Sequence, residues 1–291
     1  MISGAITALV TPFRNGAIDE EAYRAHIERQ IEQGIHGLLP CGTTGESATM
    51  SHAEHEAAIR ICLEQTKGRV PVLAGSGSNN TDEAISLTKY AKKAGADAAL
   101  LITPYYNKPT QEGLFRHFKA VNDAVSIPLF AYNVPGRTGS NLLPETVARM
   151  HKELPHLVGV KEATANLIQI SNILEQCGPD FILLSGDDFT VLPTLSLGGQ
   201  GVISVTSNIV PDLMAGLCNA WFKGDLPEAK RLHYKLEPLN RAMFLESNPI
   251  PVKTALKLMG KMSDEMRMPL CELGAQYLPK LQAVLKEYNL I

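Results

Sequence analysis

Short runs of hydrophobic residues recur along the whole chain and alternate with longer amphipathic segments. The runs are rich in Val, Ile, Leu and Ala and contain few polar residues, a pattern typical of strands buried on both faces of a parallel sheet. Eight such strands, each followed by a helix, predict an α/β fold, the TIM (β/α)8 barrel; a doubly wound open sheet is the alternative. The eight runs are Ala5–Val10, Gly37–Leu39, Val70–Leu73, Ala98–Ile102, Ile127–Ala131, Leu157–Val160, Phe181–Leu184 and Gly201–Val205.

The amphipathic segments carry hydrophobic residues at the spacing of one helix face. Helices are expected, for example, over Asp19–Gln33 and Thr81–Lys93. Residues that favour helix ends stand at the expected boundaries. They are Ser51 and Asn80 as N-caps, Pro144 in a first turn, and Gly34 and Gly95 where helices should stop.

The alternation of strands and helices ends near Phe222. The segment Gly224–Pro227 has the composition of a linker, and only helical patterns follow it. We therefore predict a barrel at residues 1–224 and a small all-helical C-terminal domain at residues 225–291. The helices of that domain are expected near Glu228–Leu245, Pro251–Gly260 and Glu272–Tyr288.

Composition narrows the class of protein. A length of 291 residues suits one barrel with a small extension. The 27 basic and 30 acidic residues give a net charge of −3, which favours neither nucleic acid nor an anionic membrane as a partner. Five widely spaced cysteines indicate reduced thiols and a cytoplasmic protein. No hydrophobic run approaches the roughly 20 residues of a membrane span, and we expect the apolar N-terminus to form a first strand rather than a signal peptide.

Polar and glycine-rich segments follow the hydrophobic runs, whereas the opposite ends of the runs are plainer. The active site of a TIM barrel lies at the carboxyl ends of its strands, so catalytic residues are expected in these segments. The segments are Gly42–Ser47, Thr103–Asn107, Tyr132–Gly139, Lys161–Thr164, Gly186–Asp188 and Thr206–Asn208.

Lys161 is the most informative residue, because it places an ammonium at the end of a strand that should be buried. It shares a strand face with Gly159 and Ala163, whose small side chains are expected to leave space around it. Burial disfavours the charged form and lowers the pKa of a lysine, and a neutral amine can attack a ketone to form a Schiff base. The alternative is a lysine paired with a carboxylate such as Glu162.

Four further residues could serve a site around that amine. Tyr132 could transfer protons while the Schiff base forms, with a structural core tyrosine as the alternative. Thr43 and Thr44 lie between two glycines, where hydroxyls and exposed amides suit a carboxylate; a simple strand-to-helix turn is the alternative. Arg137, in a loop rich in Pro and Gly, could bind a substrate carboxylate bidentately or be a surface charge.

Other motifs give weaker indications. His52 and His55 share a helix face but lack the spacing and the third ligand of a zinc site, so no metal is expected. Gly75–Asn80 lacks the last glycine of a dinucleotide-binding motif. Asp187 and Asp188 could bind a divalent ion, but we expect them to cap the next short helix.

Together these segments resemble the dihydrodipicolinate synthase/N-acetylneuraminate lyase family over nearly the whole chain. The resemblance implies a TIM barrel in which Lys161 forms an imine with pyruvate, without a cofactor because the imine itself is the electron sink. The residues that carry it are Gly42-Thr-Thr-Gly-Glu-Ser47, Thr103-Pro-Tyr-Tyr106, Tyr132-Asn-Val-Pro-Gly-Arg-Thr-Gly139, Gly159-Val-Lys-Glu-Ala163, Gly186-Asp-Asp188 and Gly201-Val-Ile-Ser204.

The resemblance also implies roles for the residues around the lysine. A proton-relay triad is matched by Thr43, Tyr132 and Tyr106, the last lent by a neighbouring subunit. Synthase-like members carry an arginine in the Pro-x-Arg-Thr-Gly loop, where it meets the carboxylate of L-aspartate 4-semialdehyde, whereas sialic-acid lyases have an apolar residue there. The residues that match substrate-binding positions are Thr43, Thr44, Arg137, Gly186 and Ile203, the last two through their backbone carbonyls.

Arg137 therefore favours condensation of pyruvate with L-aspartate 4-semialdehyde, in the diaminopimelate route to lysine. Gly136, where relatives often have serine, is a mild departure from the family pattern. One alternative is a lyase of the same family that acts on a sugar-derived 2-oxo acid. The other is a non-catalytic protein that binds 2-oxo acids.

A further set of residues resembles the positions that bind inhibitory L-lysine between subunits in feedback-sensitive relatives. Glu83 could pair with an ammonium, and a polar subunit interface without a ligand is the alternative. Since relatives are tetramers made of paired dimers, we expect a homotetramer. The set is Ser47, Ala48, His52, His55, Asn79, Glu83 and Tyr105.

Overall fold

The computed structural model describes residues 2–291, which form two compact units. The central unit comprises Pro71–Ile203 with the N-terminal residues up to Gly4. The terminal unit comprises Ala5–Val70 and Ser204–Ile291, so it brings the beginning of the chain together with its end.

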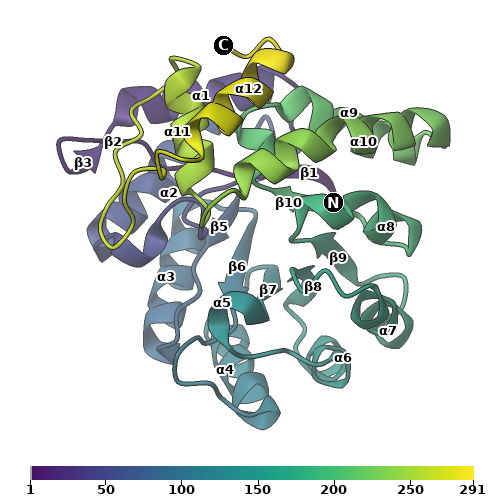
Figure 1. The fold of residues 1–291 in the computed structure, drawn as a ribbon. Coiled ribbons are helices and arrows are strands. Elements are labelled where there is room, and N and C mark those ends of the chain that lie inside the picture. The colour runs from purple at the N-terminus through teal and green to yellow at the C-terminus, as the bar shows by residue number, and fades with distance from the viewer. Residues whose placement is uncertain (1) are drawn as a thin grey trace. The chain divides into compact units, whose positions relative to one another are not determined.

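Strands and helices alternate along the central unit, and Figure 1 shows α3, α4, α6 and α7 on the outer side of β6–β9. The strands are β5 (Leu73–Gly75), β6 (Ala98–Ile102), β7 (Leu129–Asn133), β8 (Leu157–Glu162), β9 (Ile182–Ser185) and β10 (Gly201–Ser204). The helices are α3 (Thr81–Ala94), α4 (Gln111–Ala124), α5 (Pro135–Thr138), α6 (Pro144–Glu153), α7 (Leu167–Cys177), the 3-10 turn η2 (Asp188–Thr190) and α8 (Val191–Ser196).

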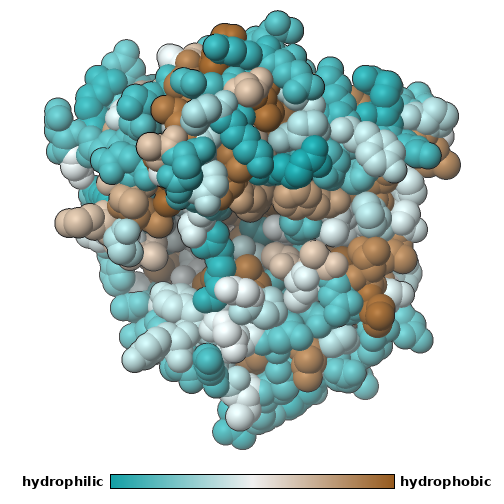
Figure 2. All heavy atoms as spheres, viewed as in Figure 1, coloured by the Kyte–Doolittle hydropathy of each residue, from teal (hydrophilic) through white to brown (hydrophobic). Residues whose placement is uncertain are grey.

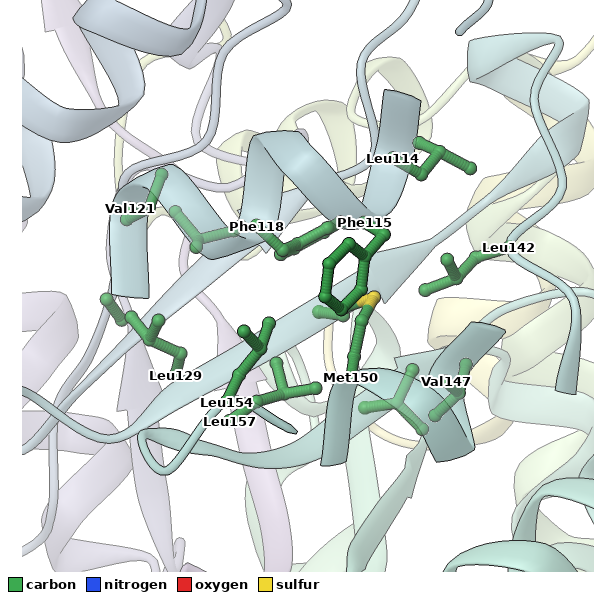
Figure 3. Close-up of a cluster of buried hydrophobic side chains, with 14 of the residues drawn as sticks. Leu114, Phe115, Phe118, Val121, Leu129, Leu142, Val147, Met150, Leu154 and Leu157 are labelled. Carbon is green, nitrogen blue, oxygen red and sulfur yellow. The ribbon is translucent and has the colours of Figure 1, made fainter. Parts of the chain in front are cut away.

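The core of the central unit includes a cluster in which α4 and α6 pack against strand residues (Figure 3). On α4, Leu114, Phe118 and Val121 are fully buried and recur at the spacing of one helix face. Leu129 of β7 and Leu157 of β8 belong to the same cluster. Burying a large hydrophobic side chain contributes about 1.5–3 kcal/mol, so this stripe explains why the segment folds as a helix against the sheet.

The terminal unit contains the first strands and the last helices of the chain. Its strands are β1 (Gly4–Ala8), β4 (Gly37–Leu39) and the hairpin of β2 (Phe13–Arg14) with β3 (Ala17–Ile18). Its helices are α1 (Glu20–Glu32), η1 (Ser47–Thr49), α2 (His52–Thr66), η3 (Thr206–Asn208), α9 (Pro211–Phe222), α10 (Leu226–Met243), α11 (Ile250–Leu258) and α12 (Leu278–Glu287). The parallel pair β1–β4 places Thr7 opposite Leu38.

The larger sheet of the described chain has eight strands, hydrogen-bonded in the order β4-β1-β10-β9-β8-β7-β6-β5. Six of the neighbouring strand pairs are parallel, from β1–β4 to β8–β9. A helix lies between each strand of this sheet and the next along the sequence. This is the arrangement of a (β/α)8 barrel. The eight strands fall on or beside the eight hydrophobic runs, so the predicted fold class is confirmed.

The five residues that were predicted to mark helix ends do so. Ser51 accepts a hydrogen bond from Glu54 N while the Glu54 side chain accepts one from Ser51 N, which forms a capping box. Asn80 caps α3, and Pro144 lies in the first turn of α6. Gly34 and Gly95 follow α1 and α3 with φ of 81° and 96°, the left-handed conformation that glycine adopts without steric cost.

Two predicted strands begin later in the structure than the sequence indicated, by two or three residues. The run Val70–Leu73 was expected to be a strand, but β5 begins at Leu73. Pro71 has no amide hydrogen, and the amide of Val72 donates to Asp97 Oδ2 at 2.8 Å rather than to a strand. The run Ile127–Ala131 also begins late, at Leu129, because Pro128 lacks an amide hydrogen too.

The predicted C-terminal helix Glu272–Tyr288 starts too early, because α12 begins at Leu278. Before it, Gly274 donates its amide to Glu246 Oε2 at 3.0 Å. The predicted linker Gly224–Pro227 is also wrong, because Pro227 lies in the first turn of α10. The division of the chain into a barrel at 1–224 and a helical domain at 225–291 stays a prediction.

Hydrophilic residues dominate the face shown in Figure 2, with hydrophobic residues interspersed among them. Within residues 2–291, none of the helices combines the length and the hydrophobicity that a bilayer span requires.

Candidate active site

Lys161 and Tyr132 lie side by side on neighbouring strands of the central unit. The parallel register places Tyr132 of β7 opposite Lys161 of β8. Lys161 Nζ lies 4.1 Å from the centroid of the Tyr132 ring, and each residue is only 7% exposed. Each is the last but one residue of its strand rather than the first of the following loop. The sheet itself therefore holds the amine against the aromatic ring.

Glu162, the alternative partner of Lys161, is engaged elsewhere. Its carboxylate accepts hydrogen bonds from Asn133 Nδ2 at 2.9 Å, Gln169 Nε2 at 3.1 Å and Thr164 N at 2.9 Å. Burial raises the pKa of Glu162, while these hydrogen bonds oppose the shift. In the part of the chain that the structure describes, no carboxylate forms an ion pair with Lys161. Pairing of this lysine with Glu162 is therefore wrong.

Gly186, in the loop after β9, makes room for the Lys161 side chain. A Cβ at Gly186 would lie 2.6 Å from Ala163 Cβ and 3.1 Å from Cγ and Cε of Lys161. The space beside Gly159 is occupied instead, because a Cβ there would come 2.5 Å from the Phe130 ring. The expectation that Gly159 leaves space around the lysine is thus corrected: the small residue that does so is Gly186.

The Gly42–Ser47 turn follows β4 in the terminal unit. Thr44 is 2% exposed, and its Oγ1 accepts a hydrogen bond from Asn248 Nδ2 at 2.9 Å, whereas Thr43 is half-buried. Cys41 and Glu46 flank the two threonines with φ of 58° and 57°. Non-glycine residues adopt this left-handed conformation only at an energetic cost, so the turn is held in shape by its surroundings.

Arg137 and Tyr106 are exposed in the segments that follow β7 and β6 in the central unit. Arg137 lies in the short helix α5 between Val134 and Gly139. Tyr106 is 90% exposed at a φ of 69°. It is the central residue of a three-residue turn in which Asn107 N donates to Tyr105 O at 2.8 Å. Both side chains are accessible to a ligand or to a second subunit.

The residues proposed to bind an effector lie in two groups. In the central unit, Asn79 Nδ2 donates to Tyr105 O at 3.2 Å, and Glu83 Oε2 accepts from Ser78 Oγ at 2.8 Å. In the terminal unit, Ser47 and Ala48 form part of η1, while His52 and His55 lie in the first turn of α2. His52 is exposed and His55 is buried, so the two histidines differ in their access to solvent.

Other candidate residues take part in local structure. Ile203 is buried in β10, and the roles of its carbonyl and that of Gly186 stay predictions. Asp187 stands at the N-cap position of η2 but makes no side-chain capping hydrogen bond, so the expected cap is not formed. Its carboxylate instead accepts a hydrogen bond from Thr190 Oγ1 at 2.9 Å. Among residues 2–291, no group of three or more His, Cys, Asp and Glu side chains is placed to hold a metal ion.

Sequence reasoning missed a second buried lysine, Lys253 of α11. It is fully buried, and its Nζ lies 2.6 Å from Glu46 Oε1 in the Gly42–Ser47 turn. The neighbouring Val252 and Ala255 are also buried. An ammonium among apolar helix residues was therefore a detectable signal, of the same kind that singled out Lys161.

Comparison with known proteins identifies the family of this chain. The model of the dihydrodipicolinate synthetase family matches residues 1–288. The chain belongs to this family. A 4-hydroxy-tetrahydrodipicolinate synthase of Nitratidesulfovibrio vulgaris is 67% identical over 283 residues, which are 97% of each chain.

Solved structures of the dihydrodipicolinate synthetase family share the fold throughout. The chloride-inhibited enzyme of Acinetobacter baumannii, complexed with pyruvate, is 44% identical with a TM-score of 0.97 and full coverage of both chains. The Cyanidioschyzon merolae enzyme, with lysine bound, is 39% identical with a TM-score of 0.96 over 99% of each chain. Both similarities agree with the eight-stranded barrel described above.

Proposed function

We propose that the chain catalyses the reaction of a 4-hydroxy-tetrahydrodipicolinate synthase, the condensation of pyruvate with L-aspartate 4-semialdehyde. Family membership and a relative at 67% identity support this activity. The observation that carries the mechanism is the buried amine of Lys161, which contacts the Tyr132 ring and has no ion-pair partner among the described residues. Such an amine is available as a nucleophile once it is neutral.

In the proposed reaction, Lys161 Nζ attacks C2 of pyruvate and water leaves, which gives an iminium. Loss of a proton from C3 then forms an enamine, because the iminium withdraws the electron pair. The enamine carbon attacks the aldehyde carbon of the second substrate, and the resulting alkoxide takes up a proton. Finally the amine of the second substrate attacks C2 and displaces Lys161, so one water is released per cycle and the enzyme is regenerated.

The residues around the lysine receive distinct roles in this proposal. Tyr132, Thr43 and Tyr106 relay protons to and from the carbinolamine, and Thr43 and Thr44 bind the pyruvate carboxylate. The contact of Tyr132 with Lys161 and the oriented hydroxyl of Thr44 support these assignments. The backbone carbonyls of Gly186 and Ile203 are proposed to line the site.

Arg137 is proposed to bind the carboxylate of L-aspartate 4-semialdehyde. Replacing this arginine therefore tests whether the semialdehyde is the second substrate. Replacing Arg137 by Ala should raise the KM for the semialdehyde by about tenfold to a hundredfold, because a charge-assisted bidentate contact is lost. The KM for pyruvate should stay within about twofold. Steady-state kinetics with both substrates measure this, and wild-type turnover of N-acetylneuraminate but not of the semialdehyde would contradict the proposal.

Regulation and assembly are further parts of the proposal. We expect L-lysine to inhibit the enzyme through Ser47, Ala48, His52, His55, Asn79, Glu83 and Tyr105; an unchanged rate at millimolar lysine would count against this. The lysine-bound state of the relative from C. merolae supports an effector of this kind. We expect a cytoplasmic homotetramer in which Tyr106, exposed in one chain, enters a neighbouring site.

A further inference from the structure

The segment at the start of α11 contacts the Gly42–Ser47 turn through two buried interactions within the terminal unit. Asn248, just before the helix, donates Nδ2 to Thr44 Oγ1 at 2.9 Å. Lys253, in the first turn of the helix, places Nζ 2.6 Å from Glu46 Oε1. The start of α11 therefore contacts two side chains of the turn, Thr44 and Glu46.

The ion pair of Glu46 and Lys253 is fully satisfied by its surroundings. Besides Glu46, the Lys253 ammonium donates to the carbonyls of Thr11 at 3.1 Å and Glu265 at 2.5 Å. The second oxygen of Glu46 accepts the amide hydrogen of Arg267 at 3.0 Å. Both side chains are fully buried. A buried pair of this kind adds little stability over a hydrophobic pair of equal volume, because desolvation offsets the attraction. What it supplies is a fixed position for the turn.

The turn requires an anchor because its backbone is strained. Glu46 itself has a φ of 57°, a conformation that persists only where contacts over-determine it. The turn also packs closely against its neighbours, because a Cβ at Gly42 would lie 2.7 Å from Leu39 Cδ2 and one at Gly45 would lie 3.1 Å from Leu9 O. The contacts of the Glu46 carboxylate with Lys253 and Arg267 thus hold the turn in this conformation.

We propose that Asn248 and Lys253 are positioning residues for pyruvate. Asn248 orients the Thr44 hydroxyl, and Lys253 holds the turn through Glu46, so together they set the geometry that Thr43 and Thr44 present to the substrate carboxylate. This inference rests on the proposed function. The inference assigns a role in pyruvate binding to the C-terminal part of the chain. Neither Asn248 nor Lys253 contacts pyruvate in the proposed mechanism.

Steady-state kinetics of Asn248→Ala and of the double variant Glu46→Gln/Lys253→Met test the inference. Each should raise the KM for pyruvate by about tenfold, the effect of losing one orienting hydrogen bond or contact. The KM for the semialdehyde should change by less than about twofold. The double variant should also regain the melting temperature lost in Lys253→Met alone, since it leaves no unpaired buried charge.

A double variant that regains its melting temperature but keeps a raised KM for pyruvate would show a positioning role rather than a purely structural one. If the double variant regains both its melting temperature and the wild-type KM for pyruvate, and Asn248→Ala binds pyruvate normally, the inference is overturned. Lys257→Met is the matched control, because Lys257 lies one turn further along α11 and pairs with Asp264 at the surface. Both of its KM values should remain within about twofold of the wild type. A wild-type chain that fails to condense the two substrates would instead refute the proposed function.

Discussion

At the scale of single residues, two lysines are buried in the described chain, and their partners separate their roles. Lys253 meets the carboxylate of Glu46. Burial lowers the pKa of Lys253, but the negative charge of Glu46 opposes that shift and favours an ammonium. Lys161 meets the ring of Tyr132 instead and has no carboxylate partner among residues 2–291. The ion pair indicates a structural role for Lys253, whereas the unpaired amine of Lys161 supports its proposed role as nucleophile.

The sequence alone could indicate Lys161 but not what surrounds it. An ammonium following Leu157–Val160 is visible in the pattern, and strand alternation predicts its face. That Gly186 rather than Gly159 makes room for the side chain depends on where Phe130 packs. The pairing of Glu46 with Lys253 joins residues 207 positions apart, and such contacts follow from the fold rather than from any local motif.

Gly186 provides a test at this scale. Gly186→Ala should lower kcat by about tenfold to a hundredfold, because the added methyl group would collide with Ala163 Cβ and crowd Cγ and Cε of Lys161, and catalysis is sensitive to small misplacements of a reacting group. Gly136→Ala is the control, since a Cβ there meets no atom within 4 Å, and it should retain a near-normal rate. A Gly186→Ala enzyme with wild-type kcat would show that the lysine has more room than the structure indicates.

At the scale of elements, the hydrophobic pattern predicted the positions of strands and helices more accurately than their first and last residues. The eight strands were predictable because each is buried on both faces. The first residue of β5 was not predictable, because it depends on Pro71, which lacks an amide hydrogen, and on the hydrogen bond from Val72 to Asp97. The hairpin of β2 and β3 was overlooked, although Asn15 and Gly16 at its turn, with φ of 54° and 77°, form a recognisable hairpin dipeptide.

The N-terminus of α2 gives a prediction for pH dependence. The guanidinium of Arg267, with help from the amide of Ser51, lowers the pKa of Glu54 from 4.5 to about 2. A carboxyl group whose pKa is lower in the folded state stabilises that state above its unfolded pKa, and the contribution is lost as pH falls toward the folded value. The wild type should therefore exceed Glu54→Gln in unfolding free energy above about pH 5, and the difference should shrink toward about pH 3.

Denaturant unfolding across this pH range measures the effect. Arg267→Met should lose most of the same pH dependence, because it removes the largest of the interactions that lower the pKa of Glu54. A difference between wild type and Glu54→Gln that stays constant from neutral to acidic pH would contradict the assignment.

At the scale of the whole molecule, the fold class was predictable from the number of hydrophobic runs, whereas the homotetramer was expected only from the family resemblance. The indication that the structure adds is Tyr106, which is 90% exposed in a strained turn. A large aromatic side chain held in this way is expected to have a partner.

Subunit complementation tests the lent tyrosine. Lys161→Ala and Tyr106→Phe should each be nearly inactive alone. In a mixed dimer, the chain with Tyr106→Phe keeps its lysine and receives an intact tyrosine from its neighbour. Equal mixing after dissociation should therefore restore about a quarter of wild-type activity, as expected for random two-fold pairs. Mixtures that remain inactive, with mixed dimers verified by mass, would place the tyrosine in its own site.

The central claim is that Lys161 forms the imine with pyruvate, and covalent trapping tests it most directly. Borohydride reduction in the presence of pyruvate should add one three-carbon unit per chain, and peptide mass spectrometry should locate it on Lys161. The Lys161→Ala variant should remain unlabelled. Labelling of Lys253 instead, or undiminished labelling of the variant, would contradict the account.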